Sequence, residues 1–181
     1  LSRLQNECLT MQRKEFNELA NSCEGKMFRL AQRLLISEDA AKDAVQEVFL
    51  KLWNIRNKLG QVKNINAYAM RMTKNHCFDR LKSKESQNLR LVHSNIDREE
   101  NSIQDDMEMQ DEVDFLKRVI NQLPERERSV IHLREIEEME LATIAEITET
   151  KEGSVRVALT RARKKIKDEM MKYRKNYRYE A

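Results

Sequence analysis

The chain has 181 residues, enough for one ordinary domain or two small ones; 36% of them are charged and 40% are hydrophobic. Three Gly and a single Pro leave little turn chemistry for hairpins, so the composition favours helices and argues against a sheet protein. No apolar run approaches the roughly 20 residues of a membrane span, and no signal peptide is visible. We therefore expect a cytoplasmic protein without membrane insertion.

The residues of reactive type are few and scattered. Cys8, Cys23 and Cys77 form no C-x-x-C pair and are odd in number, which is typical of a reduced protein of the cytoplasm. The adjacent pair His76–Cys77 lacks further ligands, so no metal site is predicted. Because no nucleophile–base arrangement or phosphate loop appears, we expect no enzyme activity, no cofactor and no small-molecule substrate.

Charge is distributed unevenly, although the net charge is only +3. Residues 63–84 carry six Lys or Arg against one acid, and residues 151–181 carry eleven against four. Between them, residues 97–112 carry eight acids against one Arg. Basic segments of this kind indicate a polyanion partner bound through its phosphates, although ordinary solvated helix faces are the alternative.

The first part of the chain is predicted to be a flexible lead-in over residues 1–10, followed by a helical domain over residues 11–86. Apolar residues keep helical spacing over positions 16–35. Ser37 is a suitable N-cap, because two acids follow it in the first turn of a helix that we expect to run to about Arg56.

The helix after Ser37 has two different faces when it is placed on a wheel at about 100° per residue. One face is apolar and is predicted to enter the core; it consists of Ala41, Val45, Val48, Phe49, Leu52 and Trp53. The opposite face gathers three acids, an amide and one apolar side chain, namely Asp39, Asp43, Gln46, Glu47 and Leu50. A Leu ringed by acids is typical of a contact surface for a basic partner helix; a plain solvated face is the alternative.

A further helix is expected from about Asn66 to Lys84, where basic residues interleave with aromatic ones. This combination suits single-stranded nucleic acid, whose bases stack on rings while cations neutralise its phosphates. The alternative is that the large apolar side chains belong to the core, and we expect most of Tyr68, Met72 and Phe78 to do so. The better candidates for exposed contacts are Asn75, His76 and the basic residues.

Helical periodicity then disappears in a polar and acidic segment. We interpret residues 87–111 as a linker. A DNA duplex would repel it, whereas a basic channel that otherwise holds nucleic acid would suit it.

The second domain is predicted over residues 112–181. Helical spacing resumes at Val113 and breaks at Leu123-Pro124, where the proline is suited to be the first residue of the next helix. The apolar residues of that next helix are Val130, Ile131, Leu133 and Ile136. Two short helices and a basic tail are expected to follow.

The last two helices have the outline of a helix-turn-helix: a short helix, a tight turn in which Thr150 can act as a cap, and a basic helix. The buried stripe of the basic helix is predicted to be Val155, Leu159, Ala162 and Ile166. Its exposed side carries Arg156, Val157, Thr160, Arg161 and Lys164. The alternative is a basic amphipathic helix packed in an unrelated bundle.

Such a helix could read base pairs in the major groove. Arg156 can donate two hydrogen bonds to a guanine, Val157 offers apolar contact, and Thr160 can bond a base or touch a thymine methyl group. The residues suited to hold phosphates are Arg161, Lys164, Lys165 and Lys167.

Together these stretches resemble extracytoplasmic-function sigma factors, over nearly the whole chain from about Met11. SEDAAKDAVQEVFLKLW is similar to the family's region 2.2, and NINAYAMRMTKNHCFDRLK to its regions 2.3 and 2.4. LPERERSVIHLREIEEMELATIAEITETKEGSVRVALTRARKK is similar to region 4. A helix-turn-helix alone is common, whereas both blocks in this order with this linker are a specific signal.

The resemblance implies that the chain binds core RNA polymerase and recognises two promoter elements. The acidic face around Leu50 would dock on the clamp helices of the β′ subunit, and the second domain on the β flap. The residues implied at the −10 element are Arg71, Lys74, Asn75 and Arg80. Those implied at the −35 element are Arg156, Val157, Thr160, Arg161 and Lys164. The linker would thread the active-site cleft and RNA exit path, and an anti-sigma factor is an expected partner.

Some positions depart from the family pattern. Tyr68-Ala69 stands where Trp-Leu is usual, Glu138 where Gly is common, and Ala142-Thr143 where an acidic pair is usual. Val157 and Thr160 are not the commonest choices in the reading helix. These departures concern the promoter sequence rather than the family.

The sequence thus predicts an all-α protein with two helical domains joined by an acidic linker, the second a helix-turn-helix domain. Two alternatives remain. A stand-alone helix-turn-helix regulator would footprint a palindrome without polymerase, and a helical adaptor that binds only protein would lack salt-dependent affinity for DNA.

Overall fold

The computed structural model describes residues 12–83 and 107–180. Within these ranges every regular element is a helix and no strand is present, so the predicted all-α class is confirmed. The chain divides into two compact units, Leu1–Ser94 and Asn95–Ala181. The expected lead-in and most of the expected linker lie outside the described residues.

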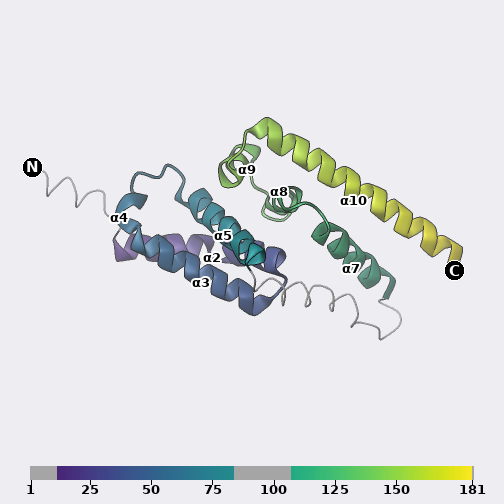
Figure 1. Cartoon of the computed structure of the whole chain (residues 1–181), viewed down its shortest axis with the longest axis horizontal. Helices are drawn as coiled ribbons and strands as arrows, with labels where there is room; N and C mark the ends of the chain where they lie inside the picture. Colours follow the sequence, from purple (N-terminus) through teal and green to yellow (C-terminus); the bar gives the residue numbers. More distant parts are fainter. Residues whose placement is uncertain (1–11, 84–106, 181) are drawn as a thin grey trace, which may run out of the picture. The chain divides into compact units, whose positions relative to one another are not determined.

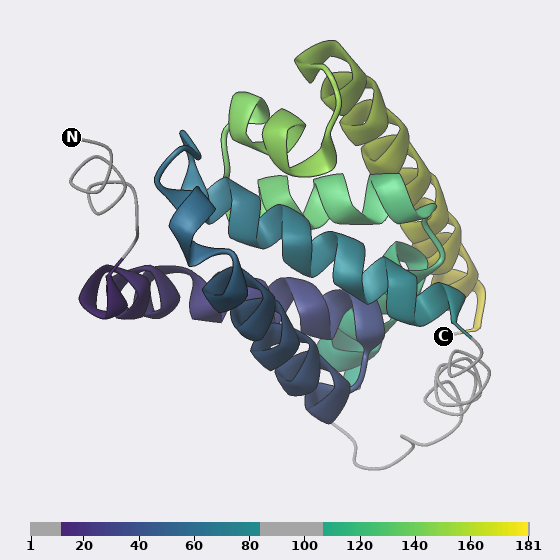
Figure 2. The same ribbon diagram turned by 60° about the vertical axis from the view of Figure 1, so that its left-hand side comes forward.

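Three long helices form the first unit. They are α2 (Arg13–Leu35), α3 (Glu38–Asn54) and α5 (Ile65–Lys82), and each packs against the other two (Figure 1 and Figure 2). A single turn of helix, α4 (Arg56–Leu59), connects α3 to the loop before α5. Side chains cap the N-termini of α3 and α5. The Ser37 hydroxyl accepts from the backbone N–H of Ala40 at 3.3 Å, as predicted, and the Asn64 side chain accepts from the backbone N–H of Ala67 at 3.0 Å.

The core of this unit forms where the apolar stripes of the three helices meet. The four aliphatic members of the predicted α3 core face are buried, and Ala40 and Ala44 join them. Phe49 and Trp53 differ from the prediction, because both are only half-buried. Their rings make T-shaped contacts with the ring of Phe16 on α2, with ring centroids 6.3 Å and 5.0 Å apart.

The second unit contains α7 (Met107–Asn121), α8 (Glu125–Glu135), α9 (Leu141–Thr148) and α10 (Glu152–Glu180). Helix α10 packs against the other three, and α8 also packs against α9. The start of α7 at Met107 falls inside the segment 87–111 that the sequence assigns to the linker. The sequence there is acidic, so its helical periodicity is not apparent.

The C-terminal segment corrects the expectation of a short helix followed by a basic tail. Helix α10 is continuous over 29 residues (Figure 1). Its second half is helical because it has a partner: the rings of Phe115 on α7 and Tyr173 on α10 stack 4.3 Å apart, and the Nε of Arg174 donates to Glu112 at 2.6 Å.

Three local expectations in the second unit were also wrong. Ile136, which the sequence assigned to the helix itself, is the C-cap of α8 and is 60% exposed. Pro124 is the N-cap of α8 rather than its first residue. Thr150 does not cap α10, which begins two residues later; its hydroxyl lies 3.0 Å from that of Thr148.

Two turns of the second unit use left-handed backbone without glycine. Glu138, between α8 and α9, has φ 52°, and this is where the resembled family commonly has Gly. Glu149, between α9 and α10, has φ 56°. There the N–H of Thr150 reaches the carbonyl of Ala145 and that of Glu149 reaches Glu146, a Schellman pattern that ends α9 sharply.

Candidate functional site

The predicted acidic face of α3 is exposed in full. Asp39, Asp43, Gln46, Glu47 and Leu50 all lie on the solvent side of the helix. Leu50 at its centre is 64% exposed. An apolar side chain held in water by its helix, with carboxylates around it, is suited to dock on a partner surface that carries cations.

Exposed large apolar side chains are few among the residues whose side chains the structure describes. They are Leu50, Val113, Ile136, Val157 and Met171. Two of them, Leu50 and Val157, are the apolar residues that the sequence placed in contact faces. Their exposure leaves both side chains accessible to a partner.

Helix α5 brings two of the four predicted −10 residues to one face. Arg71 and Asn75 are one turn apart, and Tyr68 lies beside them with its ring 4.8 Å from the Arg71 guanidinium. Lys74 lies at the edge of this face and is half-buried. Tyr68 was expected in the core but is only half-buried, so it adds a ring to the basic face, and its position among basic residues was the signal for this.

Arg80 does not join that face. Nine residues after Arg71, it lies on the opposite side of α5 at about 100° per residue. Its guanidinium reaches across to α3, where it donates to the carbonyl of Ala40 at 3.3 Å. The structure thus gives Arg80 a role in holding α5 on α3.

His76 is not the exposed contact that the sequence predicted. Its side chain is only 11% exposed and lies between two residues of α3. The Nζ of Lys51 is 3.0 Å from its Nδ1, and a carboxylate oxygen of Glu47 is 3.3 Å from its Nε2. Burial is the main reason that the pKa of His76 is lowered from 6.5, and the nearby charge of Lys51 lowers it further.

The two cysteines of the first unit that the structure describes are buried free thiols. Burial raises the pKa of Cys23 to about 11 and that of Cys77 to about 12, so both stay protonated and unreactive at neutral pH. Among the described residues, no group of His, Cys, Asp or Glu side chains could hold a metal ion. No helix in the described part of the chain is long and apolar enough to cross a membrane.

In the second unit, α8, α9 and α10 pack against one another (Figure 2). A tight turn joins α9 to α10. Val155, Leu159 and Ala162 are buried as predicted, while Ile166 is half-buried. Ala145 on α9 is small and buried, which permits α10 to cross closely. This is the helix-turn-helix arrangement expected from the sequence.

The predicted reading residues all project from the first turns of α10 into solvent. The side chain of Arg156 is 67% exposed and lies 3.5 Å from Glu152, an exposed pair that a DNA contact can replace at little cost. Val157 is 49% exposed. The hydroxyl of Thr160 donates to the carbonyl of Arg156 at 3.0 Å, so in this conformation it can accept a bond from DNA or present its methyl group.

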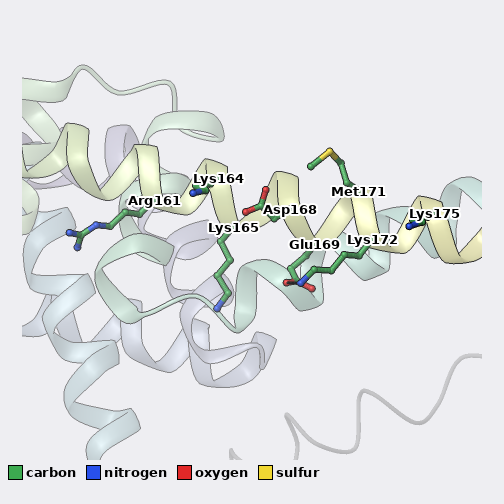
Figure 3. Close-up of a pocket in the computed structure, with 8 residues that line it drawn as sticks. All are labelled: Arg161, Lys164, Lys165, Asp168, Glu169, Met171, Lys172 and Lys175. Carbon is green, nitrogen blue, oxygen red and sulfur yellow. Dashed lines mark hydrogen bonds and ion pairs between the residues drawn. The ribbon is translucent and has the colours of Figure 1, made fainter.

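Basic residues continue along α10 beyond the reading turns. Figure 3 shows the side chains that line a shallow depression here: Arg161, Lys164, Lys165, Asp168, Glu169, Met171, Lys172 and Lys175. Lys165, predicted at a phosphate, donates to the carbonyl of Gln122 at 3.3 Å and so helps to hold the end of α7. Arg163 likewise joins α10 to α8 through Glu135 at 2.6 Å.

Buried polar groups under the helix-turn-helix escaped the sequence analysis. His132 on α8 and Glu137, two residues after that helix ends, are buried with 3.5 Å between Nε2 and Oε1. Arg128 is also buried, which lowers its pKa, and it donates to the carbonyl of Asn121 at 3.3 Å. Such residues usually signal surface in a sequence, so nothing in their spacing marked them as interior.

Two family models match the chain in the order expected. The model of Sigma-70 region 2 matches residues 19–87, and that of Sigma-70, region 4 matches residues 116–166. Together they cover about two thirds of the 181 residues. No curated protein sequence matches the chain.

Solved structures with the same fold include two complexes. One is the sigma factor RpoE bound to the anti-sigma factor NepR, from Bartonella quintana: identity is 18%, the TM-score is 0.64, and the match covers 87% of this chain and 98% of RpoE. The other is CnrH bound to the cytosolic domain of CnrY, with 19% identity, a TM-score of 0.64, and coverage of 90% and 91%. At these identities the likeness concerns the fold.

The two units therefore define a promoter-binding class of protein. Region 2, with three long helices and the single turn α4, is followed by a helix-turn-helix region 4. The chain belongs to the sigma-70 family. The sigma-factor resemblance found in the sequence is thus confirmed for the sigma-70 family, and the fold is shared with two solved structures.

Proposed function

We propose that the chain is an extracytoplasmic-function sigma factor that binds core RNA polymerase and directs initiation at promoters with defined −10 and −35 elements. The observation that carries this proposal is a pair of exposed faces of opposite charge. One is the acidic face around Leu50 on region 2, and the other is the basic face around Val157 on region 4. DNA binding by a stand-alone regulator would not require the acidic face around Leu50.

The acidic face of region 2 would dock on the β′ clamp helices through Asp39, Asp43, Gln46, Glu47 and Leu50. Cations of the partner would pair with the carboxylates while Leu50 is removed from water. Region 4 would sit on the β flap. The acidic linker would pass through the nucleic-acid channels of the polymerase, where basic walls would attract it.

Promoter recognition would be divided between the two units. On α5, Arg71, Lys74 and Asn75 would hold the unpaired strand of the −10 element, and Tyr68 would offer a ring for a base to stack on. On α10, Arg156, Val157 and Thr160 would read the −35 duplex, and Arg161 and Lys164 would hold its phosphates. Melting would follow from trapping flipped bases, whose binding offsets the lost stacking. The chain would have no enzyme activity of its own.

An anti-sigma factor is the further partner that we propose. Two structures with the same fold contain an additional bound chain, described as an anti-sigma factor in the complex of RpoE. A protein that covers both exposed faces would keep the chain from polymerase until it is released. The site of action would be the cytoplasm, where the polymerase works.

The test is transcription from a broad promoter library with purified core polymerase, with and without the chain. We expect specific start sites that appear only when both are present. If the chain instead protects a palindrome from digestion without polymerase, it is a stand-alone regulator. If neither occurs and no salt-dependent DNA affinity is measured, it is a protein-binding adaptor.

A further inference from the structure

His76 joins the two working helices of region 2. It projects from α5, directly after Asn75, and inserts between two side chains of α3 that are one turn apart. Lys51 lies 3.0 Å from its Nδ1 and Glu47 lies 3.3 Å from its Nε2. The ring of His76 thus connects α5 to a carboxylate of the acidic face of α3.

The partners determine which ring nitrogen of His76 carries the proton. The ammonium group of Lys51 can only donate, so Nδ1 must accept. In a neutral imidazole the proton is then on Nε2, which faces Glu47. Nε2 is buried and has no well-formed hydrogen bond within the described residues, so a small rotation of the Glu47 side chain toward it is favourable.

The charge state of the ring agrees with this arrangement. Burial lowers the pKa of His76 first, and the charges of Lys51 and Arg80 lower it further, against the opposing effects of Glu47 and Asp79. The ring is therefore neutral at pH 7. The Glu47 side chain is 53% exposed, so it remains accessible to a partner.

We propose that His76 is a positioning residue for the acidic face of α3, holding Glu47 in the orientation that core polymerase binds. This inference rests on the proposed function, since it assumes that Glu47 contacts polymerase. A carboxylate held in one orientation before binding loses less freedom on binding. When His76 is protonated, Nδ1 can no longer accept from Lys51, and the positive charge of the ring offsets that of the Glu47 carboxylate toward polymerase.

A double-mutant cycle on core polymerase affinity tests the proposal. We expect His76→Phe, which fills the site without hydrogen bonds, to weaken binding about three- to tenfold, and to have no further effect when Glu47→Ala is already present. Equal losses in both backgrounds would overturn the proposal. If Glu47→Ala alone leaves affinity unchanged, the assignment of the polymerase-facing surface fails instead, together with the inference that rests on it.

Two matched controls separate positioning from a general loss of structure. Asp43 lies on the same face, and we expect the effects of Asp43→Ala and His76→Phe to add. His76→Gln supplies an acceptor and a donor without titrating, so it should bind as the wild type does near pH 7.5 and lose less affinity as the pH is lowered below 6.5. Identical pH profiles of wild type and His76→Gln would contradict the proposal, with circular dichroism showing that each variant is folded.

Discussion

The acidic face of α3 and the basic face of α10 are built alike and differ in charge and placement. Each surrounds one exposed apolar residue, Leu50 at 64% and Val157 at 49%, with charged side chains on the outer side of a helix. The charged side chains around Leu50 on α3 are acidic, so DNA would repel them. Those around Val157 on α10 are basic, so phosphates would attract them. Charge therefore favours a different class of partner for each face.

Placement along the helix separates the two faces further. The face of α3 runs along the side of the helix from Asp39 to Leu50, about 16 Å at 1.5 Å per residue, which suits a partner helix laid alongside it. The reading residues of α10 are crowded into its first turns after a tight turn, so the helix end can enter a groove. A broad side suits protein, and a narrow end suits DNA.

The largest effect is expected when the acidic face is reversed. Asp43→Arg with Leu50→Ala removes a carboxylate, adds a repelled cation and deletes the apolar centre, so core polymerase affinity should fall about 10- to 100-fold. A fluorescence competition assay measures this. Because both residues are exposed, circular dichroism should be unchanged, and unchanged core affinity would mean that this face does not bind polymerase.

A smaller and more selective loss is expected on the basic face. Arg156→Ala should cost about 1–3 kcal/mol of discrimination at one base pair of the −35 element, measured by holoenzyme binding to promoter variants. Lys164→Ala is the matched control: it should weaken all sequences alike and lower the salt dependence. A uniform loss for Arg156→Ala would make that residue a phosphate contact as well.

Acid should weaken the fold of the first unit through His76. Its pKa lies below 6.5 in the folded chain, so below that pH the unfolded chain binds more protons and is favoured. The contribution of His76 to the free energy of unfolding is thus fully present above pH 6.5 and is lost as the pH falls to the lowered pKa. Urea unfolding should show a shallower decline for His76→Gln, and parallel declines would remove His76 as the cause.

The smallest expected effect sharpens the account of the second unit. Glu138 has φ 52°, so Glu138→Gly should stabilise the fold by about 0.5–1 kcal/mol. The same change at the exposed helical residue Glu146 should destabilise it by about 1 kcal/mol. Thermal unfolding distinguishes the two, and equal shifts would show that backbone conformation at Glu138 is not the reason.

The helical class, the order of the two units and the exposed face of α3 could all be predicted from periodicity, because spacing along a helix decides which residues share a side. The same reasoning failed for His76 and Arg80. Both belong to a basic stretch, and only the packing of α5 on α3 decides that they point into the fold rather than toward DNA.

The length of α10 shows a second limit. Composition predicted a basic tail after the reading helix, since lysines and arginines dominate there. What makes this segment helical is the stack of Phe115 and Tyr173, residues from opposite ends of the second unit's sequence. A contact between distant positions is not encoded in the local pattern.

The buried thiols of region 2 also make its opening measurable as a rate. Cys23 and Cys77 are buried in the first unit, and the sequence has no cysteine after residue 77. In a Cys8→Ser background, a thiol reagent can modify the chain only when the first unit opens. The labelling rate then reports the local opening equilibrium of that unit alone. Its slowing on addition of a partner measures how much that partner stabilises the closed form of region 2.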